Sequence, residues 1–274
     1  MTVVLLALAS AASFGAMTVA IRLGLRGGGG AAGGALAMLL WATAVAVVAA
    51  APRHDLHRSW QFLLAGLIAP GCSQVLFTLS VREAGPSRTS VTVGAAPLVA
   101  VGLALGFLDE PVRALLVAGA LAVVAGGLVL AGERDRPAHV RPAALAFALG
   151  ATVFFAVRDD LIRALHAHAD PEAAAAATFL GGLAVTCLWA RRAPSRDELV
   201  RLAPAGLCIG VFYVCLFEAY FRGRVSVVSP LVAAESLWGV ALSALLLRHE
   251  RVRGRVAAGA ALVVAGGVLI GLGR

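Results

Sequence analysis

The chain has 274 residues, of which 60% are hydrophobic and 14% charged, and its mean hydropathy is +0.90. A soluble domain of this size carries nearer to a quarter charged residues, so an ordinary soluble domain is excluded. The formal net charge of +8 comes from arginines that separate apolar blocks and form no basic domain, which argues against a nucleic-acid partner. The composition indicates an integral membrane protein.

Ten apolar segments of about 20 residues follow one another, which is the length that crosses roughly 30 Å of hydrocarbon. They lack the period-two alternation of barrel strands, so they predict an all-α fold with ten transmembrane helices. The links between them are too short for a soluble domain. Their approximate bounds are Thr2–Ile21, Ala31–Ala51, Trp60–Ser80, Ser87–Leu108, Ala114–Ala131, Pro142–Leu161, Pro171–Ala190, Leu202–Phe221, Val225–Leu247 and Val256–Leu272.

The chain also contains an internal repeat. EPVRALLVAGALAVVAGG, which begins at Glu110, returns 140 residues later from Glu250 as ERVRGRVAAGAALVVAGG, with eleven of the eighteen positions identical. This offset predicts a first repeat at 1–132, a linker at 133–141 and a second repeat at 142–274, each with five helices. Because five is an odd number of spans, the second repeat must enter the membrane the other way round. We therefore expect two inverted halves related by a pseudo-two-fold axis in the membrane plane.

The absolute orientation in the membrane is left open. The arginines of the loops favour both termini outside, but their excess comes mainly from the second half, whereas the first helices usually dominate.

An apolar helix with an acidic end, a short basic link and a Gly-rich helix ending in AGG occurs as GFLDEPVRALLVAGALAVVAGG and again as LLLRHERVRGRVAAGAALVVAGG. With ten helices in two halves, this pattern resembles the paired EamA domains of the drug/metabolite transporter superfamily over nearly the whole chain. One departure is Leu237, which stands where the first copy has Pro97.

The resemblance implies secondary transport, often export, of a small metabolite, amino acid-like or drug-like, by alternating access around a central cavity. It implies a multi-pass protein of the cytoplasmic (inner) membrane of a bacterium, with the bilayer and a small molecule as partners. Protons are a further expected partner, and neither a cofactor nor an enzymatic activity is expected. A membrane-embedded enzyme and a non-transporting scaffold are the alternatives.

Glu235 is the outstanding candidate for a functional residue, because it lies near the middle of the ninth predicted helix. An ionisable side chain at that depth costs on the order of 3 kcal/mol. Trp238 and Gly239 share its face at i+3 and i+4, and its repeat counterpart is Ala95. The functional interpretation is proton coupling or recognition of a substrate ammonium group. The alternative is a carboxyl kept neutral, or paired with an arginine, for packing.

Further candidates lie on the third and eighth predicted helices. Glu218 stands four residues before Arg222, which predicts either an ion pair near the interface or a cavity residue. Gln74 and Thr78 form a polar stripe, and we expect it to meet the stripe of Glu218 across the pseudo-two-fold axis. The remaining candidates for a cavity wall are aromatic, namely Tyr213, Phe14 and Phe154.

Arg158 and Asp159 close the sixth predicted helix. They are interpreted either as a gate that works through ion pairs or as a solvated helix end. His166 and His168 have no third ligand nearby in the sequence, so no metal site is predicted. The four cysteines lie in apolar segments without paired spacing, which indicates neither a disulfide framework nor a zinc site.

Overall fold

The computed structural model of the chain is helical throughout the residues that it describes, with no strand among them. These residues are 1–25, 30–52, 56–84, 89, 92–93, 96–108, 113–131 and 142–246, followed by 258–259, 261–262, 265–266, 269 and 272. The predicted linker 133–141, the acidic residues Glu110 and Glu250 and much of the tenth predicted segment lie outside them.

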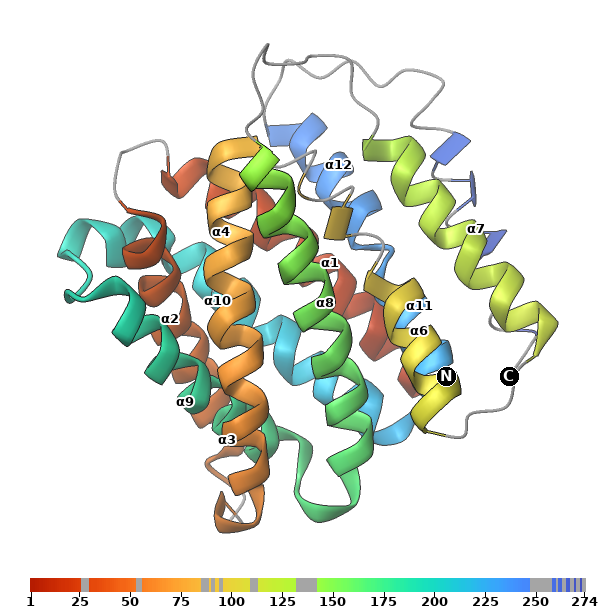
Figure 1. Ribbon diagram of the computed structural model, residues 1–274, viewed down its shortest axis with the longest axis horizontal. Coiled ribbons are helices and arrows are strands. Elements are labelled where there is room, and N and C mark those ends of the chain that lie inside the picture. Colours follow the sequence, from red (N-terminus) through yellow and green to blue (C-terminus); the bar gives the residue numbers. More distant parts are fainter. Residues whose placement is uncertain are drawn as a thin grey trace.

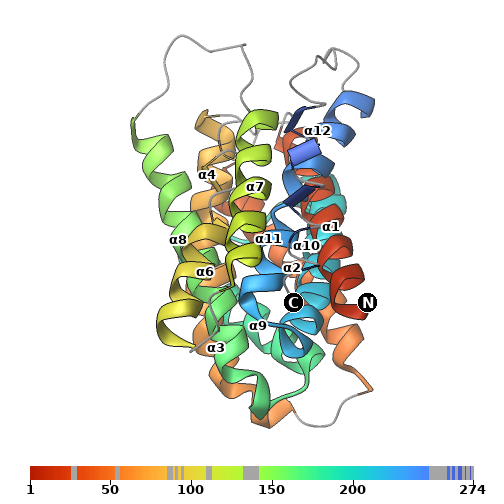
Figure 2. The ribbon, with the colours of Figure 1, turned by 90° about the vertical axis from the view of Figure 1, so that its right-hand side faces the viewer.

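The helices form one bundle (Figures 1 and 2). The first half contains α1 (Thr2–Leu25), α2 (Ala31–Ala50), the 3₁₀ turn η1 (Leu56–Ser59), α3 (Trp60–Gly66), the π-helical segment η2 (Leu67–Cys72), α4 (Ser73–Ala84), α6 (Ala96–Phe107) and α7 (Ala114–Ala131). The second half contains α8 (Pro142–Leu165), η3 (His166–His168), α9 (Pro171–Ala190), α10 (Arg196–Arg222), α11 (Val225–Val232) and α12 (Glu235–Leu246).

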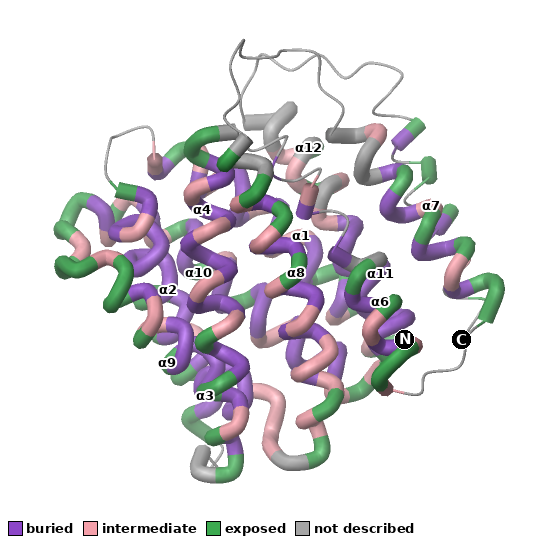
Figure 3. Tube along the Cα trace, in the orientation of Figure 1, coloured by how far each residue is buried: buried purple, intermediate pink, exposed green. Residues whose placement is uncertain are grey.

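Within the described part of the chain, five helical segments are long and apolar enough to cross a membrane, namely α1, α2, Trp60–Glu83, α9 and α10. Shorter apolar helices accompany them at Ala114–Gly126 and Val225–Gly239. Large apolar residues such as Val48 and Leu188 are exposed. Exposed positions lie toward the outside of the bundle and buried positions in its interior (Figure 3). An apolar outer surface is what contact with lipid tails requires.

Contacts between the two halves come in matched pairs. A side chain on Gly66 of α3 would strike the backbone of Thr178 on α9, and one on Gly206 of α10 would strike the backbone of Met38 on α2. Gly206 follows Gly66 by 140 residues, and Thr178 follows Met38 by the same interval. Reciprocal contacts of this kind are those that a two-fold relation produces.

The first helices of the halves run in opposite directions. In both views α1 leads from the N-terminus toward the end of the molecule at which α8 begins, and α8 leads back (Figures 1 and 2). α1 packs on α10, and α8 packs on α4, which belongs to the counterpart of α10.

Two of the predicted helices are interrupted. Ala69, inside η2, has extended backbone angles (φ −144°, ψ 121°) and precedes Pro70. The ninth predicted helix consists of α11 and α12, and between them the backbone turns at residues 233–234. Pro230 lies inside α11 and lacks the N–H that a continuous helix uses, which favours an interruption nearby. Glu235 is therefore the first residue of α12 rather than a residue in the middle of one helix.

The second half also corrects two predicted boundaries. α8 continues to Leu165, four residues beyond the predicted end, and α10 begins at Arg196, six residues before the predicted Leu202. The early start of α10 follows from a capping box. Ser195 Oγ accepts a hydrogen bond from the Glu198 amide at 3.2 Å, and a Glu198 carboxylate oxygen accepts one from the Ser195 amide at 2.8 Å.

Candidate functional site

A buried ion pair lies inside the second half. Arg158 and Asp159 are 3% and 5% exposed, because α8 does not end there and Ile162, one turn further on, is buried too. Their interpretation as a solvated helix end is therefore wrong. The role of these residues as a gate stays a prediction.

Hydrogen bonds join this pair to two tyrosines of α10. Arg158 donates from Nε and Nη2 to Asp159 Oδ1 at 2.9 and 2.6 Å, and from Nη1 to Tyr213 Oη at 3.1 Å. Tyr220 Oη donates to Asp159 Oδ2 at 2.7 Å. Tyr213 and Tyr220 are seven residues apart, two helical turns, so both hydroxyls face α8. We call these four residues the polar cluster, and it ties α8 to α10.

Aromatic rings surround the guanidinium of the polar cluster. The Arg158 Cζ atom lies 5.1, 5.6 and 5.0 Å from the ring centroids of Phe155, Phe212 and Tyr213. A buried guanidinium is costly unless it is paired, and here a carboxylate, a phenol and three ring faces compensate its charge. Removal of one partner from such a buried pair is strongly destabilising, so the polar cluster holds as a unit.

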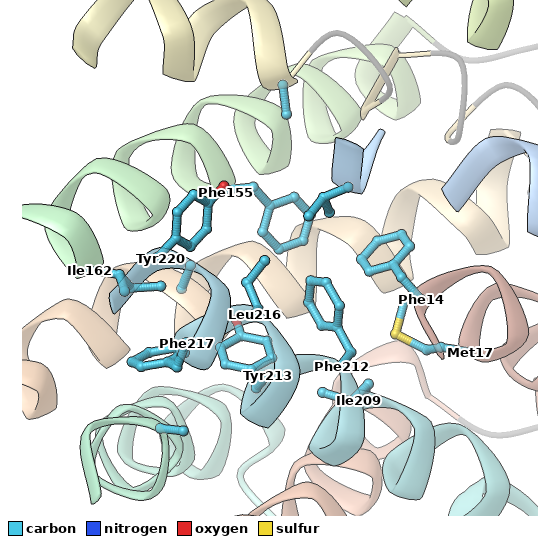
Figure 4. Packing of buried hydrophobic residues seen from close by; sticks show 14 of the residues in the cluster. Phe14, Met17, Phe155, Ile162, Ile209, Phe212, Tyr213, Leu216, Phe217 and Tyr220 are labelled. Carbon is cyan, nitrogen blue, oxygen red and sulfur yellow. The ribbon is translucent and has the colours of Figure 1, made fainter. Parts of the chain in front are cut away.

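Phe14 of α1 contacts three other phenylalanine rings, and these four rings form an aromatic group, of which Figure 4 labels Phe14, Phe155 and Phe212. Its ring meets those of Phe212, Phe77 and Phe155 edge to face, with centroids 5.0, 5.6 and 6.3 Å apart. Phe154, which the repeat pairs with Phe14, is half-buried and takes no part in these ring contacts, whereas its neighbour Phe155 does. The offset of 140 residues therefore indicated the correct helix but not the ring that enters the group.

Glu235 approaches the polar cluster from α12. Glu235 as a whole is half-buried, and its carboxylate interacts electrostatically with Arg158 and Asp159. Within the described part of the chain that carboxylate has no hydrogen-bond or ion-pair partner. A Cβ on Gly15 of α1 would lie 2.9 Å from the Glu235 carbonyl oxygen and 2.7 Å from the Gly239 amide nitrogen, so α1 and α12 touch backbone to backbone here.

Trp238 lies on the outer side of this contact. Its side chain is 42% exposed, although its Cβ sits 2.7 Å from the position that a Cβ on Gly15 would take. Gly239, which the sequence places on the same helix face as Glu235, is thus in contact with the backbone of α1.

Thr78 and Glu218, on the third and eighth predicted helices, each have a partner within their own helix. Glu218 is buried and forms an ion pair with Arg222, as one of the two interpretations of its spacing predicted. Thr78 Oγ1 donates to the Gln74 carbonyl oxygen at 2.7 Å, within α4. The amide nitrogen of Gln74 is buried without a hydrogen-bond partner among the described residues. No hydrogen bond or ion pair between described residues joins Glu218 to Gln74 or Thr78.

Phe155 and Phe212 were not singled out from the sequence, and neither was the hydrogen bond that the Ser229 hydroxyl forms with Tyr220. A usable signal was the seven-residue spacing of Tyr213 and Tyr220 opposite a charged pair on another helix. Among the described residues, no group of three His, Cys, Asp or Glu side chains is placed to hold a metal ion.

The helical fold and its polar interior define a multi-pass membrane protein. The family model of the EamA-like transporter family matches the chain twice, at residues 1–132 and at 142–272. The chain therefore belongs to the EamA-like transporter family, a family of membrane transporters within the drug/metabolite transporter superfamily.

Structure comparison finds the same fold in a solved structure. A solved structure described as "Crystal structure of protein" is 19% identical in sequence, with a TM-score of 0.82, and the match covers 98% of this chain and 96% of that one. No curated protein matches the chain in sequence.

Proposed function

We propose that this chain is a secondary transporter that exports a small metabolite, amino acid-like or drug-like, across the cytoplasmic (inner) membrane of a bacterium. Ten transmembrane helices form two inverted five-helix repeats, 1–132 and 142–274. The halves rock against each other about a central cavity, so that the cavity opens to one side of the membrane at a time.

The arrangement of the halves supports this mechanism. α1 and α8 run in opposite directions, and the contact of Gly66 with Thr178 has its counterpart in that of Gly206 with Met38. Related but oppositely oriented units have two equivalent ways of packing, one open to each side, which is the requirement for alternating access.

The observation that carries the proposal is Glu235 at the interruption between α11 and α12. Interrupted helices expose backbone polar groups at membrane depth, and these are tolerated where they are buried in protein or line a water-filled cavity. Transporters commonly place substrate and ion sites at such interruptions. Glu235 adds a carboxylate without a partner in the described structure, beside the polar cluster of Arg158, Asp159, Tyr213 and Tyr220. An ionisable group in that position suits proton coupling or substrate recognition.

Two measurements on the purified protein test the proposal. A thermal-shift screen against amino acids and other metabolites identifies ligands, since a ligand present at 100 times its Kd adds about 2.7 kcal/mol to the stability of the folded state. The best ligand is then radiolabelled and offered to proteoliposomes under an imposed pH gradient. We expect accumulation that collapses when the gradient is dissipated.

The alternatives give different results in the same assay. A membrane-embedded enzyme converts the ligand chemically, and a scaffold neither moves nor converts it. Movement that follows the concentration gradient alone and ignores the pH gradient would contradict proton coupling.

A further inference from the structure

The charges around Glu235 do not balance. Arg158 Nη2 lies 2.6 Å from Asp159 Oδ1, so the charges of these two residues neutralise each other. Glu235 adds a third ionisable group without a partner among the described residues. The elements around it supply no further counter-ion, since the described residues of α7, α11 and α12 include no basic residue. The one charged residue of α1, Arg22, lies about two turns beyond Gly15. Apart from Arg158, which is paired with Asp159, the described residues of α7, α11 and α12 and the part of α1 around Gly15 supply no positive charge that would balance an ionised Glu235.

Arg158 has little capacity to take a substrate anion. Its Nε, Nη1 and Nη2 atoms already donate to Asp159 and Tyr213, and its plane is covered by ring faces. Both carboxylate oxygens of Asp159 are likewise engaged, Oδ1 by Arg158 and Oδ2 by Tyr220. An anionic ligand would have to break this arrangement and would also meet the carboxylate of Glu235.

The surroundings of Glu235 suit an apolar body that carries a cation. Gly15, which touches the Glu235 carbonyl, directly follows Phe14 at the centre of the aromatic group. Aromatic faces attract ammonium groups, and ring edges pack against apolar ligand surface. Phe155 and Phe212 already accept a cation from the chain itself, the Arg158 guanidinium.

We infer that the transported molecule is an organic cation, an amine on an apolar or aromatic body, and that Glu235 is its counter-ion. This inference rests on the proposed transport function and specifies its substrate class. When no amine is bound, a proton on Glu235 supplies the missing positive charge. Amine and proton therefore exclude each other at one carboxylate.

The test is a series of probes that share one body and differ in charge. 2-Phenylethylamine is a cation at neutral pH, 2-phenylethanol is neutral, phenylalanine is a zwitterion and 3-phenylpropionate is an anion. Binding to the detergent-purified full chain is measured by titration calorimetry in the wild type, in Glu235→Gln and in Glu235→Asp. Glu172→Gln, at the first turn of α9 and outside the site, is the matched control.

We expect the amine to bind at least about tenfold more tightly than the alcohol, and the anion not to bind saturably. Glu235→Gln should weaken the binding of the amine by about tenfold or more without changing the affinity for the alcohol, and Glu172→Gln should change neither affinity. Glu235→Asp, which keeps the charge, should retain part of the amine affinity.

Three results overturn the inference: equal affinity of the amine for wild type and Glu235→Gln, tighter binding of the anion than of the amine, or no binding of the amine at all. Size-exclusion chromatography of each variant separates these results from a folding defect. An amine that binds through Glu235 but is not moved in proteoliposomes contradicts the transport function and leaves the site assignment standing. Transport of a different solute by a protein that does not bind the amine contradicts the assignment of the site and leaves the transport function standing.

Discussion

The two halves share a backbone plan but not a chemistry. In the first half Ser80 Oγ and Thr89 Oγ1 form a hydrogen bond of 2.8 Å. The residues 140 positions later are Tyr220 and Ser229, and they too are hydrogen-bonded. The same contact therefore joins the same two parts of each half, but in the second half it reaches on to a carboxylate, because Tyr220 also donates to Asp159.

The buried ion pair shows the same divergence. Arg158 and Asp159 stand where the first half has Thr18 and Val19. Thr18 satisfies its hydroxyl within its own helix, by a hydrogen bond to the Phe14 carbonyl at 3.1 Å. A guanidinium and a carboxylate need more partners than a small hydroxyl, so Arg158 and Asp159, besides pairing with each other on α8, take Tyr213 and Tyr220 of α10 as partners. At this position the first half is satisfied within one helix, whereas the second half depends on contacts between helices that a ligand or a proton can alter.

Among the variants that test this difference between the halves, the one that removes the charge of Glu235 should have the largest effect, and this effect is on transport. Glu235→Gln keeps the shape of the side chain and removes its negative charge, so we expect transport in proteoliposomes to fall to the level of empty vesicles. Glu172→Gln should transport like the wild type. Transport by Glu235→Gln that matches the wild type at every pH removes this carboxylate from the mechanism.

The next largest effect is expected on stability, when Arg158 and Asp159 are replaced by threonine and valine, the residues at the equivalent positions of the first half. Asp159→Val alone leaves the Arg158 charge buried without its carboxylate, and should cost about 3–5 kcal/mol. Arg158→Thr with Asp159→Val removes both charges and should recover most of that loss, while transport stays abolished. The measurement is the unfolding temperature of the purified variants. A double variant no more stable than Asp159→Val would show that the two charges are not coupled.

The hydrogen-bonded hydroxyls of the two halves, at Ser80 and at Tyr220, allow a comparison of how much each contributes to stability. Tyr220→Phe removes the donor to Asp159, and a hydrogen bond to a charged group contributes about 1.5–3 kcal/mol. Ser80→Ala removes a hydrogen bond between two neutral hydroxyls, and such a bond contributes about 1 kcal/mol to stability. Unfolding curves of both variants give the comparison. Equal losses would contradict the view that the second half has the stronger polar contacts.

Two glycines complete the comparison, and the one on α6 gives the smallest expected effect. Gly15→Ala places a methyl group against the backbone of α12 beside Glu235 and should cost about 1–3 kcal/mol. Gly102→Ala, on α6, meets nothing within 4 Å and should stabilise its helix by up to about 1 kcal/mol. Opposite shifts in unfolding temperature are the expected result. A stable Gly15→Ala variant would show that α12 moves away from α1 easily.

Hydropathy and the repeat predicted the helical class, the family and most helix positions, because both signals are averaged over many residues. Glu235 stood out because a carboxylate in an apolar segment is costly whatever surrounds it. Arg158 and Asp159 were placed at a helix end because two adjacent charges after an apolar run usually meet water. Their true partners, Tyr213 and Tyr220, lie more than 50 residues away in sequence, and no local pattern reports such a contact.

The repeat was less reliable for individual side chains. It paired Phe14 with Phe154, yet Phe155 enters the aromatic group. A duplicated backbone conserves the places where helices cross. A rotation of one helix about its axis by part of a turn, however, can bring the next residue along the chain into the same position, so Phe155 can take the place expected for Phe154.

The crossings at Gly66 and Gly206 constrain how the two halves can move. At both points the backbone of one half rests directly on the backbone of the other, with no side chain between them. A side chain at such a point can change rotamer and let two helices slide, but a bare backbone contact resists displacement. Gly15 of α1 adds a third backbone contact between the halves, against α12. Three residues without side chains thus act as fixed points at which the two halves rest on each other, and any relative motion of the halves has to keep or break these contacts.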